Sequence, residues 1–201
     1  MTVSSTSSAR DVFCSIYARD AWKGGSGEGS RAENTLIYRE YLQQFLKEKN
    51  IRTVVDFGCG DWQFSKLIDW SNTHYLGVDI VPEVIRKNRD VFGRDRIDFA
   101  IVDGPKSALP EADLLIVKDV LQHWPTTDVQ SFLTTLSRFR FALITNCIDT
   151  ATNTDCELGG YRGIDLRSPP FSLSCTEVLN FEWHSDYHGK SFRKATFLFA
   201  R

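Results

Sequence analysis

The segment Thr53–Trp62 constrains the fold of this 201-residue chain more than any other. Its apolar residues predict a buried β-strand that stops at the carboxylate of Asp56. Gly58 and Gly60 then predict a sharp turn, because glycine adopts backbone angles that other residues avoid. After this turn, we expect a helix to open at 63–68.

The following segments extend the pattern. Tyr75–Val78 predicts a second strand, which also stops at a carboxylate, that of Asp79. A strand, a glycine turn, a helix and a second strand ending in an acid form the layout of a nucleoside site in an open α/β sheet. Periodicity predicts further strands at 97–102, 112–118 and 141–146, and helices at 11–22, 34–49, 82–91 and 127–139, with a short helical connector at 119–124.

This alternation predicts an α/β fold, a single Rossmann-like three-layer sandwich with a mostly parallel seven-stranded sheet. Two last strands, at 176–183 and 195–201, are expected to form a C-terminal antiparallel hairpin. The length suits one domain, 1–201. Within it, we expect 1–10 to be a disordered tail and 11–49 to hold N-terminal helices and a glycine-rich segment.

Charge and hydropathy exclude several classes of protein. The net charge of −2 and the pI of about 6.1 give no basic footprint, which argues against a nucleic-acid partner. Apolar runs fall short of the roughly 20 residues that a membrane span needs. The first ten residues lack the apolar core of a secretory signal, and the five cysteines show no paired short spacing. These features favour a cytoplasmic protein, and they leave the oligomeric state open.

The glycine turn itself indicates which nucleoside it suits. A diphosphate-binding turn carries a third glycine, and here that position is Gln63. Asp56 and Asp61 place two acids at the turn, and these would repel a diphosphate but suit a cationic ligand. S-adenosylmethionine, a nucleoside with an ammonium and a sulfonium and no phosphate, fits this description. An NAD-dependent oxidoreductase on a similar sheet is the alternative, and a binding protein without turnover is another.

Four motifs in order carry a family resemblance. They are Val54–Gly60, Gly77–Asp79, Val102–Gly104 and Lys118–Trp124. Over about residues 50–146 the chain resembles class I S-adenosylmethionine-dependent methyltransferases, and its last two strands resemble that family's reversed hairpin. The chain departs from many members at Trp62, where they have a glycine, so we expect the methionine end of the cofactor to meet a larger side chain.

The resemblance implies a methyltransferase that binds S-adenosylmethionine. Asp79 would accept the ribose hydroxyls, and Asp103 or the amide of Gly104 would meet the adenine edge. The full set of expected cofactor-binding residues is Asp56, Gly58, Cys59, Gly60, Asp79, Ile80, Asp103, Gly104, Lys118 and Trp22.

Candidate catalytic and substrate residues follow the fourth and fifth strands. Asp119 and His123 are four residues apart, so His123 can act as a general base that Asp119 orients. The alternative is that Asp119 caps the connector and His123 packs or faces the cofactor. The expected substrate residues are Asn146, at the end of the fifth strand, and three residues of the long loop that follows it, Tyr161, Arg162 and Phe171.

Two interpretations of the glycine-rich segment 23–30 remain open. It is either a flexible linker or a lid that closes over a ligand, with Trp22 as an apolar flap. We expect the acceptor to be a small molecule methylated at oxygen or nitrogen, with a protein or RNA acceptor as the alternative. No metal is expected, because His184, Asp186 and His188 alternate within a turn and lack a fourth ligand.

Overall fold

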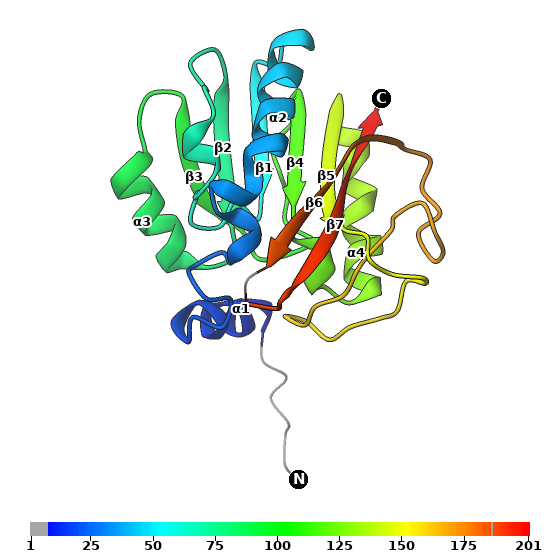
Figure 1. The fold of residues 1–201 in the computed structure, drawn as a ribbon. Coiled ribbons are helices and arrows are strands. Elements are labelled where there is room, and N and C mark those ends of the chain that lie inside the picture. Colours follow the sequence, from blue (N-terminus) through cyan, green and yellow to red (C-terminus); the bar gives the residue numbers. More distant parts are fainter. Residues whose placement is uncertain (1–7, 186) are drawn as a thin grey trace.

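The computed structural model describes residues 8–185 and 187–201, so most of the expected tail and Asp186 lie outside the described residues. A central sheet carries helices on both faces (Figure 1). The helices are α1 (Ala9–Ala18), α2 (Leu36–Glu48), α3 (Pro82–Phe92) and α4 (Thr126–Leu133), and the strands are β1 (Thr53–Phe57), β2 (His74–Asp79), β3 (Ile97–Ile101), β4 (Leu114–Lys118), β5 (Phe141–Cys147), β6 (Thr176–Ser185) and β7 (Lys190–Ala200).

The sheet has the order β3-β2-β1-β4-β5-β7-β6. Strands β1 to β5 pair in parallel, whereas β7 pairs antiparallel with both β5 and β6. The predicted fold class is therefore confirmed. The hairpin is longer than expected, because β7 begins at Lys190 and its first residues pair with the end of β6.

Both faces of the sheet are buried, which explains why β4 is apolar from Leu114 to Val117. Leu42 and Phe45 of α2 pack in the core on one face. Val129 and Phe132 of α4 pack in the core on the other. Among the described helices, none has the length and apolar character required to cross a membrane.

Several predicted element boundaries were wrong. The helix expected at 63–68 is a single 3-10 turn, Ser65–Leu67, and Ile68 is already extended. Trp62 before it has a φ of 60° and Ile68 after it has φ −98° and ψ 142°, so the backbone leaves room for one turn only. The helix expected at 127–139 ends at 133 and continues as a 3-10 helix, Thr134–Arg138.

The N-terminal helix begins earlier than predicted. Ser8 caps α1, since its hydroxyl accepts from the amide of Asp11 and the Asp11 carboxylate accepts from the amide of Ser8. Residues 8–10 are thus ordered, contrary to the expected tail. Figure 1 shows α1 lying across the end of the sheet to which the parallel strands point, where Phe13 and Ile16 join the core.

Candidate active site

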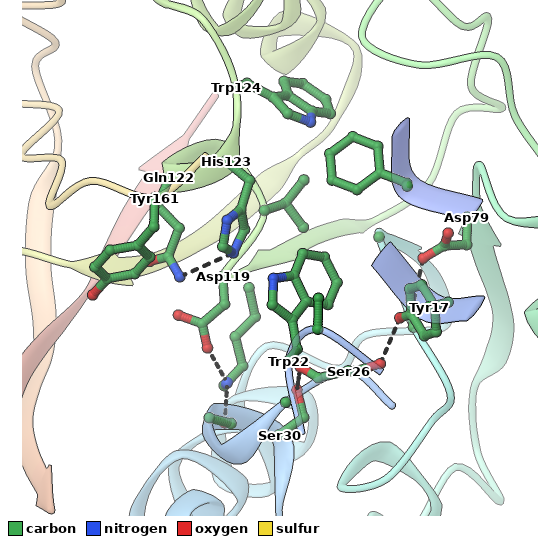
Figure 2. Close-up of a pocket in the computed structure, with 18 of the residues that line it drawn as sticks. Tyr17, Trp22, Ser26, Ser30, Asp79, Asp119, Gln122, His123, Trp124 and Tyr161 are labelled. Atoms are coloured by element: carbon green, nitrogen blue, oxygen red, sulfur yellow. Dashed lines mark hydrogen bonds and ion pairs between the residues drawn. The ribbon is translucent and has the colours of Figure 1, made fainter. Parts of the chain in front are cut away.

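A cavity of about 360 Å³ opens at the carboxyl ends of the parallel strands. In Figure 2, Asp79 and Tyr17 lie on one side of it, Asp119 and Tyr161 lie on the other, and Trp22 stands between them. This edge is where open α/β sheets bind their ligands. The strand ends, α1, the segment 22–30 and the C-terminal hairpin all contribute to its walls.

The turn after β1 fits the cavity because it is built from glycine. Gly58 and Gly60 have positive φ angles of 73° and 53°. A Cβ on Gly58 would lie 2.4 Å from a methyl carbon of Val120, and one on Gly60 would lie 2.1 Å from the hydroxyl of Ser26. Both glycines line the cavity. Cys59 between them is buried in the core beneath α2, so its side chain points away from the cavity.

The two acids of the turn do not reach the cavity, contrary to the expectation that they would face a cationic ligand. The Tyr75 hydroxyl donates to Asp56 at 2.6 Å, and burial raises the pKa of Asp56 to about 6 although this hydrogen bond and one from Ser65 oppose the shift. The carboxylate of Asp61 accepts instead from the side chain of Gln63 at 2.9 Å. Among the described residues, the carboxylates that line the cavity are Glu28, Asp79 and Asp119.

Trp62 does not narrow the cavity, and the expectation that it would meet the cofactor is corrected. Its φ angle of 60° turns the side chain into the core, where it packs against Tyr75, Phe92 and Phe99. It is 2% exposed. The indole of Trp62 therefore fills space in the core and takes none from the cavity.

Asp79 lies at the end of β2 with its carboxylate at the cavity. Its two oxygens accept from the amides of Gly60 at 3.1 Å and Val81 at 3.0 Å, and this orients the side chain. Burial raises the pKa of Asp79, opposed by these hydrogen bonds. Ile80 and Gly104 also line this end of the cavity.

Asp103 is directed away from the cavity. Its side chain is largely exposed and forms an ion pair with Arg10 of α1. Of the pair expected at the adenine edge, Gly104 lines the cavity. The Asp103 carboxylate instead fastens α1 to the loop after β3.

A charged cluster closes the floor below the glycine-rich segment. The Asp119 carboxylate accepts from the ammonium groups of Lys118 at 2.6 Å and Lys194 at 2.5 Å. Burial lowers the pKa of Lys118 to about 8, against the attraction of Asp119. Burial would raise the pKa of Asp119, but the two lysines outweigh it and lower this pKa to about 2. All three residues line the cavity.

His123 is oriented by the loop and not by Asp119. Its Nδ1 lies 2.6 Å from the carbonyl oxygen of Gly160, which accepts the Nδ1 proton and leaves the lone pair on Nε2, where the side-chain amide of Gln122 donates to it at 3.4 Å. Burial lowers the pKa of His123, so the ring is neutral at pH 7. The Asp119–His123 pairing expected from their spacing is absent, because the connector 121–123 is a 3-10 turn and the lysines hold Asp119.

The segment 22–30 is fastened over the cavity at several points. The Ser26 hydroxyl lies 2.8 Å from that of Tyr17 and accepts from the amide of Asp61 at 2.9 Å. Lys118 donates to the carbonyl of Gly29 at 2.8 Å. The Trp22 ring lies 5.0 Å from that of His123, between centroids. These contacts favour the lid over the flexible linker.

Tyr161 is the expected substrate residue that lines the cavity. Arg162 is buried beneath it and donates to the carbonyl of Trp124 at 2.8 Å and the hydroxyl of Thr126 at 2.9 Å. Phe171 is buried in the core. Asn146 is fully buried, and its amide atoms have no hydrogen-bond partner among the described residues. These three side chains lie outside the cavity wall.

Other cavity residues were missed from the sequence. They include Tyr17 near the N-terminus, and Trp183, Phe192 and Lys194 on the hairpin. The partial alternation of β7 was the available signal, since it places Phe192 and Lys194 on one face.

Comparison with known proteins gives one match to a family model and several to solved structures. Residues 55–139 match the family model described as a methyltransferase domain. This span contains the glycine turn, Asp79 and the charged end of β4. This part of the chain is a methyltransferase domain, similar to those of S-adenosylmethionine-dependent methyltransferases. Among curated proteins, no match to this methyltransferase was found.

Solved methyltransferases share its fold. Magnesium protoporphyrin IX methyltransferase from Synechocystis PCC 6803, with bound SAM, is 14% identical, with a TM-score of 0.65 over 98% of this chain and 99% of that chain. The Burkholderia thailandensis 1,6-didemethyltoxoflavin-N1-methyltransferase is also 14% identical, with a TM-score of 0.64 over 96% of this chain and 87% of that chain. At such low identities, the structural similarity establishes the fold of the chain but not its methyl acceptor.

S-adenosylmethionine, which is bound in a solved structure of the same fold, fits the residues present. Asp79 keeps free lone pairs toward the cavity after accepting two backbone amides. Gly58 and Gly60 line the cavity next to it, and their positive φ angles make the turn that brings their backbone there. The apolar side chain of Ile80 and the backbone of Gly104 border the same end.

Proposed function

We propose that this methyltransferase transfers the methyl group of S-adenosylmethionine to an oxygen or nitrogen atom of a small-molecule acceptor. The observation that carries the proposal is one cavity with two chemically distinct ends under a fastened lid. Asp79 and the glycine turn form one end, and aromatic rings form the other. We further propose that 1–201 is a single domain and that the protein acts in the cytoplasm.

The cofactor end has three roles to fill. Asp79 would accept hydrogen bonds from the ribose hydroxyls, Gly58 and Gly60 would let the methionine part pass, and Ile80 and Gly104 would border the adenine. Trp22 would enclose the sulfonium region, and Lys118 would hold the lid above it through the carbonyl of Gly29. Asp56, Cys59 and Asp103 would support these residues without contact, since their side chains are directed elsewhere.

When bound, the cofactor supplies a methyl carbon on a positively charged sulfur, and the acceptor lone pair forms the new bond as the carbon–sulfur bond breaks. The protein mainly positions the two partners, which can contribute several kcal/mol or more. Its Trp22 and the segment 22–30 exclude water from the cavity. The products would be the methylated acceptor and S-adenosylhomocysteine.

His123 is the residue that we propose as general base. Its Nε2 carries the lone pair because Nδ1 donates to Gly160, and its lowered pKa keeps it neutral. Once an acceptor replaces the long 3.4 Å contact from the Gln122 amide, Nε2 can take the proton that an O–H or N–H acceptor loses. Asp119 would be a poor base, because its pKa of about 2 keeps it ionised and bonded to two lysines. We assign Asp119 a positioning role. Arg162, Phe171 and Asn146 would support the loop after β5 that carries Tyr161.

A small acceptor is favoured over a protein or RNA. The lid residues Ser26 and Gly29 are bonded across the cavity, which suits a ligand that is enclosed. A net charge of −2 gives little attraction for phosphate backbones.

The test has two stages. Calorimetry should first detect binding of S-adenosylhomocysteine and not of NADH. Methyl-labelled S-adenosylmethionine should then label the small-molecule fraction of a cell extract, and not its protein or RNA fraction. Label confined to protein or RNA would refute the acceptor class, and binding of NADH alone would refute the chemistry. His123→Asn should lower turnover while leaving S-adenosylhomocysteine affinity within about twofold.

A further inference from the structure

The cavity end away from Asp79 is walled by aromatic rings. Trp183 and Phe192 of the hairpin stack with centroids 5.3 Å apart and planes inclined by 19°. Tyr161 meets Phe192 edge-on at 6.2 Å, and His188 meets it at 5.5 Å. All four rings line the cavity. Flat faces and edges of this kind pack best against another flat ring.

The same end carries a buried excess of positive charge. Lys118 and Lys194 share the one carboxylate of Asp119, so the three groups sum to one positive charge. Their side chains are 3%, 4% and 13% exposed, in the order Lys118, Lys194, Asp119. Asp56 also attracts Lys118 but lies outside the cavity, whereas the ammonium of Lys194 has Asp119 as its one ion-pair partner among the described residues. Lys194 is therefore the cation of this cluster that is suited to an anionic ligand.

The remaining cavity carboxylates do not cancel this charge. Glu28 pairs with Arg31 and accepts from Ser185 and the amide of Tyr187. Asp79 lies at the opposite end. Lys23, whose ammonium lies 5.9 Å from the Tyr187 ring, adds another cation near the aromatic wall.

We propose that the methyl acceptor is a flat aromatic molecule that carries an anionic oxygen group, such as a carboxylate, bound beside Lys194. This inference rests on the proposed function and names its substrate class. The rings of Trp183, Phe192 and Tyr161 hold the flat face, and the ammonium of Lys194 receives the anion. A cationic acceptor is disfavoured, because Lys194 already lies 5.2 Å from the Trp183 ring centroid and would repel it.

Three probes separate shape from charge. They are 2-naphthoate, which is flat and anionic, its neutral analogue 2-naphthamide, and decahydro-2-naphthoate, which is anionic with saturated rings. Their affinities are measured by calorimetry on the full chain saturated with S-adenosylhomocysteine. We expect 2-naphthoate to bind at least tenfold more tightly than either analogue. Equal affinities for the three, or no binding of 2-naphthoate, would overturn the proposal.

A matched pair of variants tests the position of the charge. Lys194→Met should weaken 2-naphthoate binding at least tenfold, while Lys194→Arg should keep it within about threefold. Lys190→Met is the control, because Lys190 lies on the same strand, 4.8 Å from the Phe192 ring centroid, but is exposed and outside the cavity wall. An equal loss in the control would overturn the proposal.

The two proposals fail in different ways. If S-adenosylhomocysteine binds but 2-naphthoate binds no more tightly than its analogues, the proposed acceptor class alone is refuted. If 2-naphthoate binds but S-adenosylhomocysteine does not, the methyl-transfer function is refuted, while the aromatic, cationic pocket is supported. Circular dichroism of each variant separates either result from loss of the fold.

Discussion

Replacing Asp79 by alanine tests the cofactor end of the cavity most directly. The carboxylate accepts two backbone amides and keeps lone pairs facing the cavity for the ribose hydroxyls. Asp79→Ala leaves those hydroxyls unpaired in a buried site, which costs about 1–3 kcal/mol. S-adenosylhomocysteine should therefore bind roughly 5- to 150-fold more weakly.

The same substitution also affects the free protein. The amides of Gly60 and Val81 lose their acceptor, so we expect unfolding in urea to become easier by about 1–3 kcal/mol. Calorimetry must accordingly be run below the denaturation temperature of the variant, with folding checked by circular dichroism. The affinity loss then reports the ribose contact and not the folded fraction.

Asp103→Ala is the matched control. This acid ends the neighbouring strand but is exposed and paired with Arg10. It should leave S-adenosylhomocysteine affinity within about twofold. Unchanged affinity in Asp79→Ala, or an equal loss in Asp103→Ala, would show that the ribose is bound elsewhere.

Three further substitutions probe the lid, the charged floor and the loop. Ser26→Ala removes the acceptor for the Asp61 amide and should lower kcat/KM several-fold while changing the free energy of unfolding little. An unaltered kcat/KM would favour a flexible linker over a lid. Asp119→Asn should lower the free energy of unfolding by about 2 kcal/mol at pH 7, because folding lowers the pKa of Asp119 from 3.8 to about 2. The difference between the variant and the unmodified protein should shrink as pH falls from about 4 to 2. A difference in urea titrations that does not depend on pH would contradict this. Arg162→Ala should lower the free energy of unfolding by about 2–4 kcal/mol, since it removes hydrogen bonds to the Trp124 carbonyl and the Thr126 hydroxyl. A loss below about 0.5 kcal/mol would mean that other contacts hold the loop.

Spacing along the chain predicted the fold and the backbone of the cofactor end. The turn at Gly58 and Gly60 and the acid at Asp79 follow from strand ends, and strand ends follow from apolar runs. The direction of a side chain is a different matter. Trp62 turns inward because its φ is positive, and Asp103 turns outward because Arg10 of α1 reaches it.

The acceptor end depended on contacts between distant parts of the chain. Asp119 and Lys194 are 75 residues apart, and the sequence holds no local sign that β7 will insert beside β5 with this register. His123 likewise donates its hydrogen bond to the carbonyl of Gly160, in a loop without periodicity. Sequence spacing therefore paired Asp119 with the wrong neighbour.

The attachments of the segment 22–30 bear on how fast ligands can exchange. Ser26 is anchored to α1 and to the turn after β1, Gly29 to the end of β4, and Glu28 to the last residue of β6. Partial opening would break some of these bonds without freeing the entrance, so detachment has to be concerted. We expect release of S-adenosylhomocysteine, rather than methyl transfer itself, to be the rate-limiting step of turnover.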